Sequence, residues 1–337
     1  MPNIKEKIKS FFNKSFLTVA FSCAAGLAPY PRDVVLSQPG LPAQPVEITV
    51  DPPANDDCAC AEPTANGDPT VTTPNRYAYI VIDEKTGAVI KEKDADLPLY
   101  PASMTKMMTL YLTFEAIESG QLSLSQYLPV SRHAAAQPAS ALFLSSKDSI
   151  TVEKAIHALT VKSANDCAVV LAEAIGGTEK NFAKMMSTKA CDLGMSGTHF
   201  ANASGLPDQN NFSTVRDMAT LSNAIINDWP QYYPAFSKKT FTYNGKTHYT
   251  HNRLLNTYPG MDGLKTGFIN ASGFNLAASA TQNGERVIAV IIGGQSAASR
   301  NKNMEQLLND GFTAIRKTKT AAPKKEQADV KKTYTPT

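Results

Sequence analysis

Residues 103–117 read Ser-Met-Thr-Lys-Met-Met-Thr-Leu-Tyr-Leu-Thr-Phe-Glu-Ala-Ile, with apolar side chains at regular intervals of three and four. This spacing places side chains on one face of an α-helix. The apolar residues with this spacing are Met104, Met107, Met108, Tyr111, Leu112, Phe114 and Ile117. Because a glycine commonly follows the last turn of a helix, the pattern predicts an amphipathic helix that begins near Ser103 and ends at Gly120.

The segments near both ends of this region favour β-strands. Residues 77–83 are rich in β-forming side chains, and after a turn 88–91 continue as a second strand, which predicts a hairpin. Residues 273–280 and 286–292 have the same character. They are separated by a segment containing Asn283-Gly284, a pair that favours a tight hairpin turn.

The middle of the chain is mainly helical in pattern. Helical periodicity recurs at 152–161, 167–174 and 182–193, which predicts an all-helical insert between Leu122 and Asp217. A final helix is expected over 302–315. Strands at both ends with helices between and after them predict an α+β domain whose sheet is assembled from distant segments.

The N-terminal segment has the pattern of an export signal. Lysines precede the short apolar run 16–25, and small residues follow it, so we expect a signal peptide over 1–28. Lipid attachment at Cys23 is an alternative. Residues 29–75 are dense in Pro, Asp, Ala and Thr without a sustained apolar period, which predicts an extended linker. The protein is therefore expected to be exported and to act in the periplasm or elsewhere outside the cytoplasm.

The rest of the chain is predicted to form one folded domain over 76–316 and a basic, disordered tail over 317–337. The tail could associate with anionic lipid or wall polymer. The whole chain has 33 Lys and Arg against 30 Asp and Glu, a net charge of +3. Because this balance lacks the strong basicity of nucleic-acid-binding domains, we expect no nucleic-acid partner.

Cysteine and histidine spacings indicate neither a disulfide scaffold nor a metal site. Of the five cysteines, only Cys167 and Cys191 fall in the predicted fold, where we interpret them as two buried thiols, although a bridge stays open. The five histidines lack metal-ligand spacing, apart from His248 and His251, which have no carboxylate or cysteine nearby. No metal and no other cofactor is expected.

Ser103 and Lys106 are the first candidates for chemistry. Three residues apart on a helix, they share one face, about 5–6 Å apart at Cβ. A serine hydroxyl becomes a nucleophile when a base accepts its proton, and lysine is a base only when neutral. Burial, a second cation and the positive end of the helix all favour the neutral amine. The same S-x-x-K spacing recurs from Ser299 to Lys302, and Ser103 could instead cap the helix.

Two further motifs follow in order along the chain. Ser163-Ala-Asn165 lies between two predicted helices, where a loop can present a hydroxyl and an amide to a cleft. Lys265-Thr-Gly267 opens the strand-rich region, where a sheet edge could pair with an extended peptide and Lys265 and Thr266 could reach its carboxylate. A second K-T-G, residues 85–87, lies in the predicted hairpin turn and is interpreted as turn chemistry.

Together, the three motifs resemble those of penicillin-binding proteins and serine β-lactamases. The surroundings 161–166, 199–207 and 261–267 are similar to those in the low-molecular-mass D-alanyl-D-alanine carboxypeptidases, and the resemblance covers about 76–294. It implies a serine β-lactamase/DD-peptidase-like fold, an antiparallel sheet flanked by helices. It also implies hydrolysis of the terminal D-alanine from peptidoglycan pentapeptide stems, with β-lactams as covalent inhibitors.

The resemblance also implies the role of each residue. Ser103 would be the nucleophile and Lys106 its base. Ser163 would relay a proton to the leaving amine, and Asn165 would orient Lys106 and the substrate amide. Lys265 and Thr266 of the K-T-G motif, which ends at Gly267, would hold the terminal carboxylate. The backbone amides of Ser103 and Phe268 would form the oxyanion hole.

The sequence departs from the family pattern in three places. Phe268 follows K-T-G where many relatives have a polar residue. The upstream cation that assists carboxylate binding in some relatives could correspond to His251 or Arg253. The C-terminal β-sandwich of well-known members is expected to be absent. Two alternatives stay open: a β-lactamase, and a β-lactam-sensing or wall-binding protein with slow turnover.

Overall fold

The computed structural model describes residues 77–321 of the chain. The predicted signal peptide, the linker, the alternative lipidation site at Cys23 and the tail beyond residue 321 lie outside the described residues. No helix within 77–321 is both long and apolar enough to cross a membrane.

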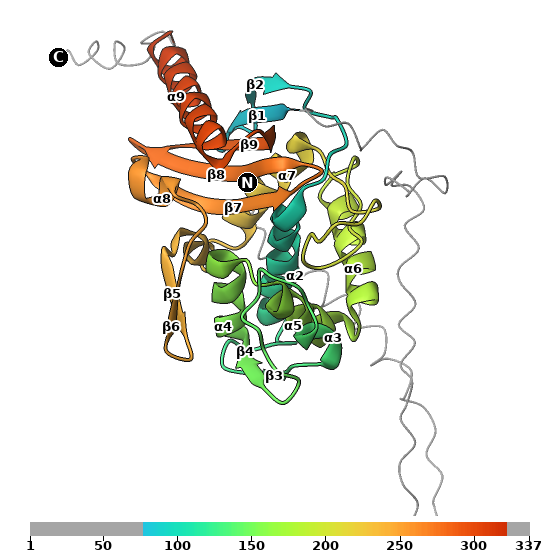
Figure 1. Ribbon diagram of the computed structural model, residues 1–337. Coiled ribbons are helices and arrows are strands. Elements are labelled where there is room, and N and C mark those ends of the chain that lie inside the picture. Colours follow the sequence, from blue (N-terminus) through green and yellow to red (C-terminus); the bar gives the residue numbers. More distant parts are fainter. Residues whose placement is uncertain (1–76, 322–337) are drawn as a thin grey trace, which may run out of the picture. The chain divides into compact units, whose positions relative to one another are not determined.

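A five-stranded antiparallel sheet forms one layer of the fold, with the order β2-β1-β9-β8-β7 (Figure 1). Its strands are β1 (Ala78–Asp83), β2 (Val89–Lys93), β7 (Met261–Ile269), β8 (Gly273–Gln282) and β9 (Glu285–Gly294). The first strand therefore pairs directly with the last. Asn283 and Gly284 both have positive φ between β8 and β9, which suits the tight hairpin that the sequence predicts. The predicted α+β class is confirmed.

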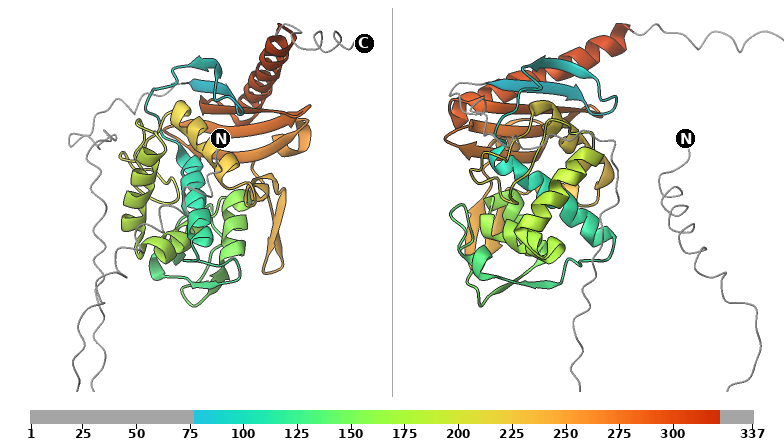
Figure 2. Two further views of the ribbon diagram at one scale, coloured as in Figure 1. Left: turned by 180° about the vertical axis from the view of Figure 1, so that it is seen from behind. Right: turned by 90° about the vertical axis from the view of Figure 1, so that its right-hand side faces the viewer.

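Successive residues of a strand point to opposite faces of the sheet. Alternate side chains therefore pack into two separate hydrophobic cores. On β9, Val287, Ala289 and Ile291 face the long helix α9 (Ala297–Ala321), whereas Ile288 and Val290 join the core of the helical layer. Figure 2 shows α9 on one side of the sheet and the helices of residues 106–228 on the opposite side. The near-continuous apolar runs of β8 and β9 reflect this burial on both faces.

Helix α2 (Lys106–Glu118) is buried on almost all sides, so the predicted amphipathic helix is a central one instead. Its threonines satisfy their hydroxyls inside the protein: Thr109 Oγ1 donates to Ala203 O at 2.7 Å, and Thr113 Oγ1 donates to Thr109 O at 2.7 Å. Helices α5 (Asn165–Gly176), α6 (Glu179–Asp192) and α7 (Val215–Asp228) and the short turn before α2 surround it. Because Thr109 and Thr113 are polar, the sequence pattern predicts an exposed face where the helix is in fact buried.

The insert between the outer strands is mainly helical but not all-helical. It contains a two-stranded sheet of three-residue strands, too short for a pattern of alternation to mark them. The elements are β3 (Tyr127–Pro129), α3 (Arg132–Ala135), β4 (Ser149–Thr151), α4 (Val152–His157), a π-helical turn (Ala158–Lys162), α5 (Asn165–Gly176), α6 (Glu179–Asp192) and α7 (Val215–Asp228). A 3₁₀ turn (Tyr233–Ser237), the hairpin β5 (Thr240–Tyr243) and β6 (Lys246–Tyr249), and α8 (Leu254–Thr257) lead to β7.

The last helix is longer at both ends than the sequence predicts. Ser296 Oγ accepts from Ser299 N at 3.1 Å, so α9 begins at Ala297 rather than near 302. It continues to Ala321, which makes 317–321 helical and not part of a disordered tail. Pro323 is the first helix-breaking residue after the predicted end.

The two cysteines of the fold differ from the interpretation as two buried thiols. Cys167 on α5 is a free, buried thiol, as expected. Cys191, near the end of α6, is disulfide-bonded, and since Cys167 is free the bridge does not join these two cysteines. Cys191 is partly exposed, unlike the buried Cys167.

Gly311 marks a close approach of α9 to the sheet. A Cβ added there would lie 2.7 Å from Val287 Cγ1 and 3.1 Å from Val81 Cγ1. Gly→Ala in an unobstructed helix stabilises by about 1 kcal/mol, but here we expect Gly311→Ala to destabilise by about 1–3 kcal/mol through overpacking. Urea unfolding measures this change.

The matched test repeats Gly311→Ala in a Val287→Ala background, which provides room for the added methyl. There the substitution should become less costly, revealing a coupling between the two positions. Stabilisation by Gly311→Ala in the otherwise unchanged protein would contradict this packing.

Candidate active site

Ser103 lies in a 3₁₀ turn (Ala102–Thr105) that runs directly into α2. Side chains three apart nearly eclipse in a 3₁₀ turn, which brings Ser103 Oγ to 3.2 Å from Lys106 Nζ. Neither this turn nor α2 has a side-chain cap hydrogen bond at its N-cap, Pro101 or Thr105. Ser103 is therefore not a helix cap in this structure.

Lys106 is fully buried and its amine has three neighbours. Nζ donates to Asn165 Oδ1 at 2.7 Å and to Ser204 O at 2.5 Å, and Ser103 Oγ completes the set. A neutral amine has two N–H groups and one lone pair. Since two neighbours are acceptors without a proton to give, the lone pair of the neutral form is left for the Ser103 hydroxyl.

The surroundings favour this neutral form. Burial lowers the pKa of Lys106 well below its ordinary value, and the nearby Lys265 lowers it further. The carboxylates of Asp166 and Glu179 raise the pKa of Lys106, but the net shift of this pKa is still downward. The amine is thus suited to accept a proton from Ser103.

Ser163 follows the π-helical turn in a left-handed conformation, with φ of 60°. Its buried Oγ has no hydrogen-bond partner among the described residues, which is uncommon for a buried hydroxyl. Asn165, two residues later, is held by its backbone N–H, which donates to Ser140 O at 2.7 Å, and by its Nδ2, which donates to Pro138 O at 2.9 Å. The Asn165 amide is thereby oriented with its oxygen toward Lys106.

The segment 138–144 beside this loop is anchored by a buried carboxylate. Asp166 accepts from Leu142 N at 3.1 Å and from Leu144 N at 3.2 Å. Ser140 in turn lines the cleft. This role could not be predicted from the sequence, because Asp166 accepts from backbone N–H groups more than twenty residues away along the chain.

Side-chain to backbone hydrogen bonds also hold the loop that contains Ser204. Asn202 Oδ1 accepts from Ser204 N and Gly205 N, and Glu179 Oε1 accepts from Ala203 N at 3.0 Å. Gly205 has φ of +76°, and a Cβ there would lie 1.9 Å from Ala102 O. Through these contacts the loop packs against the turn that contains Ser103, and the Ser204 carbonyl is oriented toward Lys106.

The K-T-G motif lies on β7, which is an edge strand. Lys265 is buried, and its Nζ donates to Thr266 O at 3.0 Å. Burial and the neighbouring Arg300 lower the pKa of Lys265 to about 7. A Cβ on Gly267 would lie 2.6 Å from Pro101 O and 3.2 Å from Ser103 N, so only glycine permits this approach of β7 to the serine turn.

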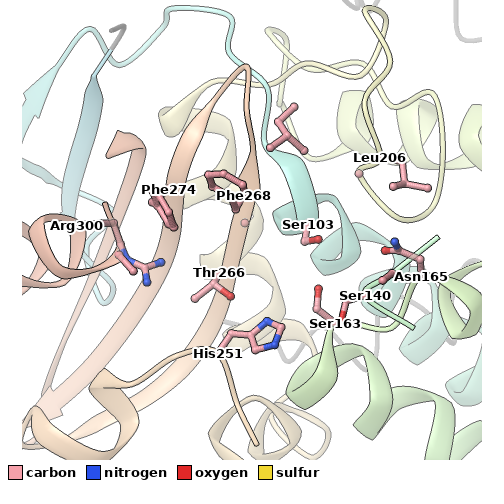
Figure 3. A pocket seen from close by; sticks show the side chains of 15 residues that line it. Ser103, Ser140, Ser163, Asn165, Leu206, His251, Thr266, Phe268, Phe274 and Arg300 are labelled. Carbon is pink, nitrogen blue, oxygen red and sulfur yellow. The ribbon is translucent and has the colours of Figure 1, made fainter. Parts of the chain in front are cut away.

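The three motifs meet in one cleft of about 470 Å³. Six of the sequence-predicted residues line it: Ser103, Ser163, Asn165, Thr266, Gly267 and Phe268. Lys106 and Lys265 are buried behind its wall. Figure 3 shows Ser103 and Ser163 facing each other, with Thr266 beside them. Among His, Cys, Asp and Glu of residues 77–321, no group of three could hold a metal ion.

The choice between His251 and Arg253 is resolved in part, since only His251 lines the cleft. Burial and Lys265 lower the pKa of His251 to about 4, so this imidazole is neutral at physiological pH. Arg300, which belongs to none of the three motifs, also lines the cleft, and its Nη1 donates to Asn275 O at 2.6 Å. It lies inside the second S-x-x-K pattern, whose Ser299 takes part in the N-terminal hydrogen bonds of α9.

The chain is similar to known proteins over most of its described residues. Residues 65–296 match the model of the D-alanyl-D-alanine carboxypeptidase family of peptidases. The chain is 34% identical over 243 residues to D-alanyl-D-alanine carboxypeptidase DacF of Bacillus subtilis, covering 69% of this chain and 61% of that protein. It is 35% identical over 252 residues to DacC of Escherichia coli, covering 72% and 63%. The chain thus spans about three fifths of these relatives' length.

Solved structures show the same fold. The carboxypeptidase DacD from Francisella tularensis superimposes with a TM-score of 0.69 at 30% identity, covering 73% of this chain and 72% of that one. Penicillin-binding protein D2 from Listeria monocytogenes, in its ampicillin-bound form, gives 0.65 at 33% identity and covers 71% and 100%. The fold is therefore that of the penicillin-binding DD-peptidases, as the resemblance implied.

Two glycines with nearly equal φ allow the packing of the Ser204 loop to be measured. Gly205→Ala would place a methyl against Ala102 O, whereas Gly194, with φ of +77°, has nothing within 4 Å of an added Cβ. Gly194→Ala should cost about 1–2 kcal/mol from backbone strain alone. We expect Gly205→Ala to cost at least about 2 kcal/mol more in chemical unfolding. Equal costs would mean that the loop is not held against Ala102.

Proposed function

Since the chain belongs to the D-alanyl-D-alanine carboxypeptidase family, we propose that it hydrolyses the terminal D-alanine from peptidoglycan pentapeptide stems through an acyl-enzyme at Ser103. One observation carries this proposal. The buried Lys106 amine lies 3.2 Å from Ser103 Oγ, with its two other contacts to oxygen acceptors and a lowered pKa. This arrangement provides the base that a serine nucleophile requires.

In the acylation step, Ser103 Oγ attacks the carbonyl carbon between the two D-alanines. Its proton passes to the lone pair of Lys106 as the Oγ–C bond forms. The ammonium produced is stabilised at once by Asn165 Oδ1 and Ser204 O, which already accept from Nζ. No rearrangement of these acceptors is needed for the proton transfer.

The negative charge that develops on the carbonyl oxygen requires donors in place. We assign the backbone N–H groups of Ser103 and Phe268 to this role. The close approach at Gly267, where a Cβ would lie 3.2 Å from Ser103 N, supports their convergence. Loss of one such donor typically costs about 3–4 kcal/mol of transition-state stabilisation.

Collapse of the intermediate breaks the C–N bond, and the leaving amine needs a proton. Ser163 Oγ is buried, has no hydrogen-bond partner within residues 77–321 and lies across the cleft from Ser103, so it is suited to relay the proton from Lys106 (Figure 3). Water then attacks the acyl-enzyme, with Lys106 again accepting a proton. This second step frees Ser103 and releases the shortened stem.

Recognition of the terminal carboxylate is assigned to Lys265 and Thr266. A carboxylate beside Lys265 favours its charged form and raises a pKa that burial and Arg300 hold at about 7. The His251 imidazole is neutral, so it would contribute a hydrogen bond rather than a charge. β-Lactams present a similar carboxylate and a reactive carbonyl, and we propose that they acylate Ser103 as substrates do.

The setting follows from the substrate. Peptidoglycan lies outside the cytoplasm, so we propose export by the N-terminal signal 1–28 and a role in cell-wall biogenesis and cell shape. Membrane or wall association through the chain's ends belongs to the same proposal.

The first test supplies the purified protein with a D-Ala-D-Ala pentapeptide and, separately, with fluorescent penicillin. We expect release of free D-alanine and long-lived labelling. Ser103→Ala should abolish the label and lower D-alanine release by at least about 10³-fold.

Other outcomes identify the alternatives. Rapid turnover of the label without D-alanine release would indicate a β-lactamase. Stable labelling without D-alanine release would indicate a β-lactam sensor. Labelling that persists in Ser103→Ala would contradict the assignment of the nucleophile.

The second test is the pH dependence of kcat/KM, which reports groups of the free enzyme. Lys106 must be neutral, so activity should rise with pH as this amine loses its proton at its lowered pKa. Lys265 must be charged, so activity should fall as pH passes about 7. Lys265→Arg keeps the charge and should move the falling limb to higher pH.

The exposed Lys302→Arg serves as the matched control and should leave both limbs in place. A falling limb that stays near pH 7 in Lys265→Arg would remove Lys265 from carboxylate binding.

A further inference from the structure

Glu179 lies between the molecular surface and the loop that contacts Lys106. It is the first residue of α6, and its side chain is 14% exposed. Its Oε1 accepts from Ala203 N at 3.0 Å, and its Oε2 lies 2.6 Å from Nε2 of His133, a side chain that is 56% exposed. One carboxylate therefore joins an exposed imidazole on α3 to the backbone of the Ser204 loop.

The backbone that Glu179 holds is the one that positions the proposed base. Ala203 is held on both sides, because its N–H donates to Glu179 and its C=O accepts from Thr109 Oγ1 of α2 at 2.7 Å. The next carbonyl along the chain, Ser204 O, accepts from Lys106 Nζ. Loss of the Glu179 contact would leave the Ala203 N–H without its acceptor and one side of this residue unheld.

Glu179 also acts on Lys106 through its charge. Within residues 77–321 the two side chains share no hydrogen bond or ion pair. The carboxylate nevertheless raises the pKa of Lys106, as Asp166 does, against the burial and the Lys265 charge that lower it. Because an electrostatic interaction weakens with distance, a carboxylate behind the loop favours the ammonium without keeping the resting amine charged.

A helix-stabilising role alone does not account for these contacts. The N-cap of α6 is Thr178, whose Oγ1 accepts from Asn181 N at 3.1 Å. A carboxylate in the first turn can stabilise a helix through its charge, which requires no partner outside the helix. Both oxygens of Glu179 are instead directed at groups outside α6, the Ala203 N–H and the His133 ring.

We propose that Glu179 is a positioning residue for the Lys106 base. One of its oxygens holds the backbone of the Ser204 loop, and His133 orients the other. Its charge supports the ammonium that forms when Lys106 accepts the proton of Ser103. The proposal rests on the proposed function, in which Lys106 is that base. Glu179 does not line the cleft, so its effect should be on kcat rather than on KM.

Two substitutions separate the hydrogen bond from the charge. Glu179→Gln keeps an oxygen that can accept from Ala203 N but removes a charge that raises the pKa of Lys106. The amine then becomes neutral at lower pH, so the rising limb of kcat/KM should move to lower pH. Glu179→Ala removes both contributions and should lower kcat by roughly 10- to 100-fold, with KM changed by less than about twofold.

Both variants are measured in the full chain. D-Alanine release from the pentapeptide gives kcat and KM across the pH range, and the rate of fluorescent penicillin labelling reports acylation of Ser103 without the hydrolytic step. Glu173→Gln is the matched control. Glu173 Oε1 accepts from Ser131 Oγ at the start of α3 at 2.9 Å but does not contact the Ser204 loop, so this change should leave kcat and the limb in place.

The role of His133 is tested by a double-mutant cycle. His133→Ala should lower kcat by about two- to fivefold in the otherwise unchanged protein and have no further effect in Glu179→Ala, because it acts through Glu179. Additive effects of the two substitutions would remove His133 from the proposal.

A rising limb that stays in place in Glu179→Gln, or an unchanged kcat in Glu179→Ala, would overturn the positioning role alone. Circular dichroism checks that each variant is folded, and if Glu179→Ala is not, the limb of Glu179→Gln decides. Absence of D-alanine release from the unchanged protein would overturn the proposed function, and the role of Glu179 with it.

Discussion

The burial of Lys106 is the constraint on which the site depends. Moving an ammonium ion out of water is costly, and a buried lysine commonly becomes neutral instead. The protein supports this neutral amine with three segments: the serine turn before α2, the start of α5 at Asn165, and the loop at Ser204. Each segment has its own anchor, and loss of any one would leave a buried polar group without its partner.

A second buried lysine strengthens this arrangement. Lys265 lies close enough to lower the pKa of Lys106, while Arg300 acts on Lys265 in the same way. Three basic side chains thus share one region of low dielectric, and their mutual repulsion favours loss of a proton from the most buried one. In the proposed mechanism Lys106 is a neutral base and Lys265 a charged anchor. Because both side chains are lysines, this difference has to come from burial and neighbours.

Much of this could be predicted from the sequence, because the relevant signals are local. Asn283 and Gly284 adopt the positive φ values that a tight hairpin turn requires, so the pair predicts the hairpin. The order of the three motifs along the chain indicated one site. The anchors of the site could not be found in this way. The Ser204 carbonyl is a backbone group that any residue provides, and Asp166 acts on backbone N–H groups that are close only in the folded chain. Arg300 was overlooked since its significance depends on α9 beginning beside the cleft.

The pairing of β1 with β9 has a consequence for how the protein is made. The first strand of the fold bonds to one that emerges from the ribosome about two hundred residues later, so the five-stranded sheet is incomplete until nearly the whole domain is synthesised. Such long-range pairing also slows folding. The edge strand that borders Ser103 is held by β8, which β9 holds in turn. Nascent chains should therefore be inert, and the cleft should be among the last parts of the molecule to form.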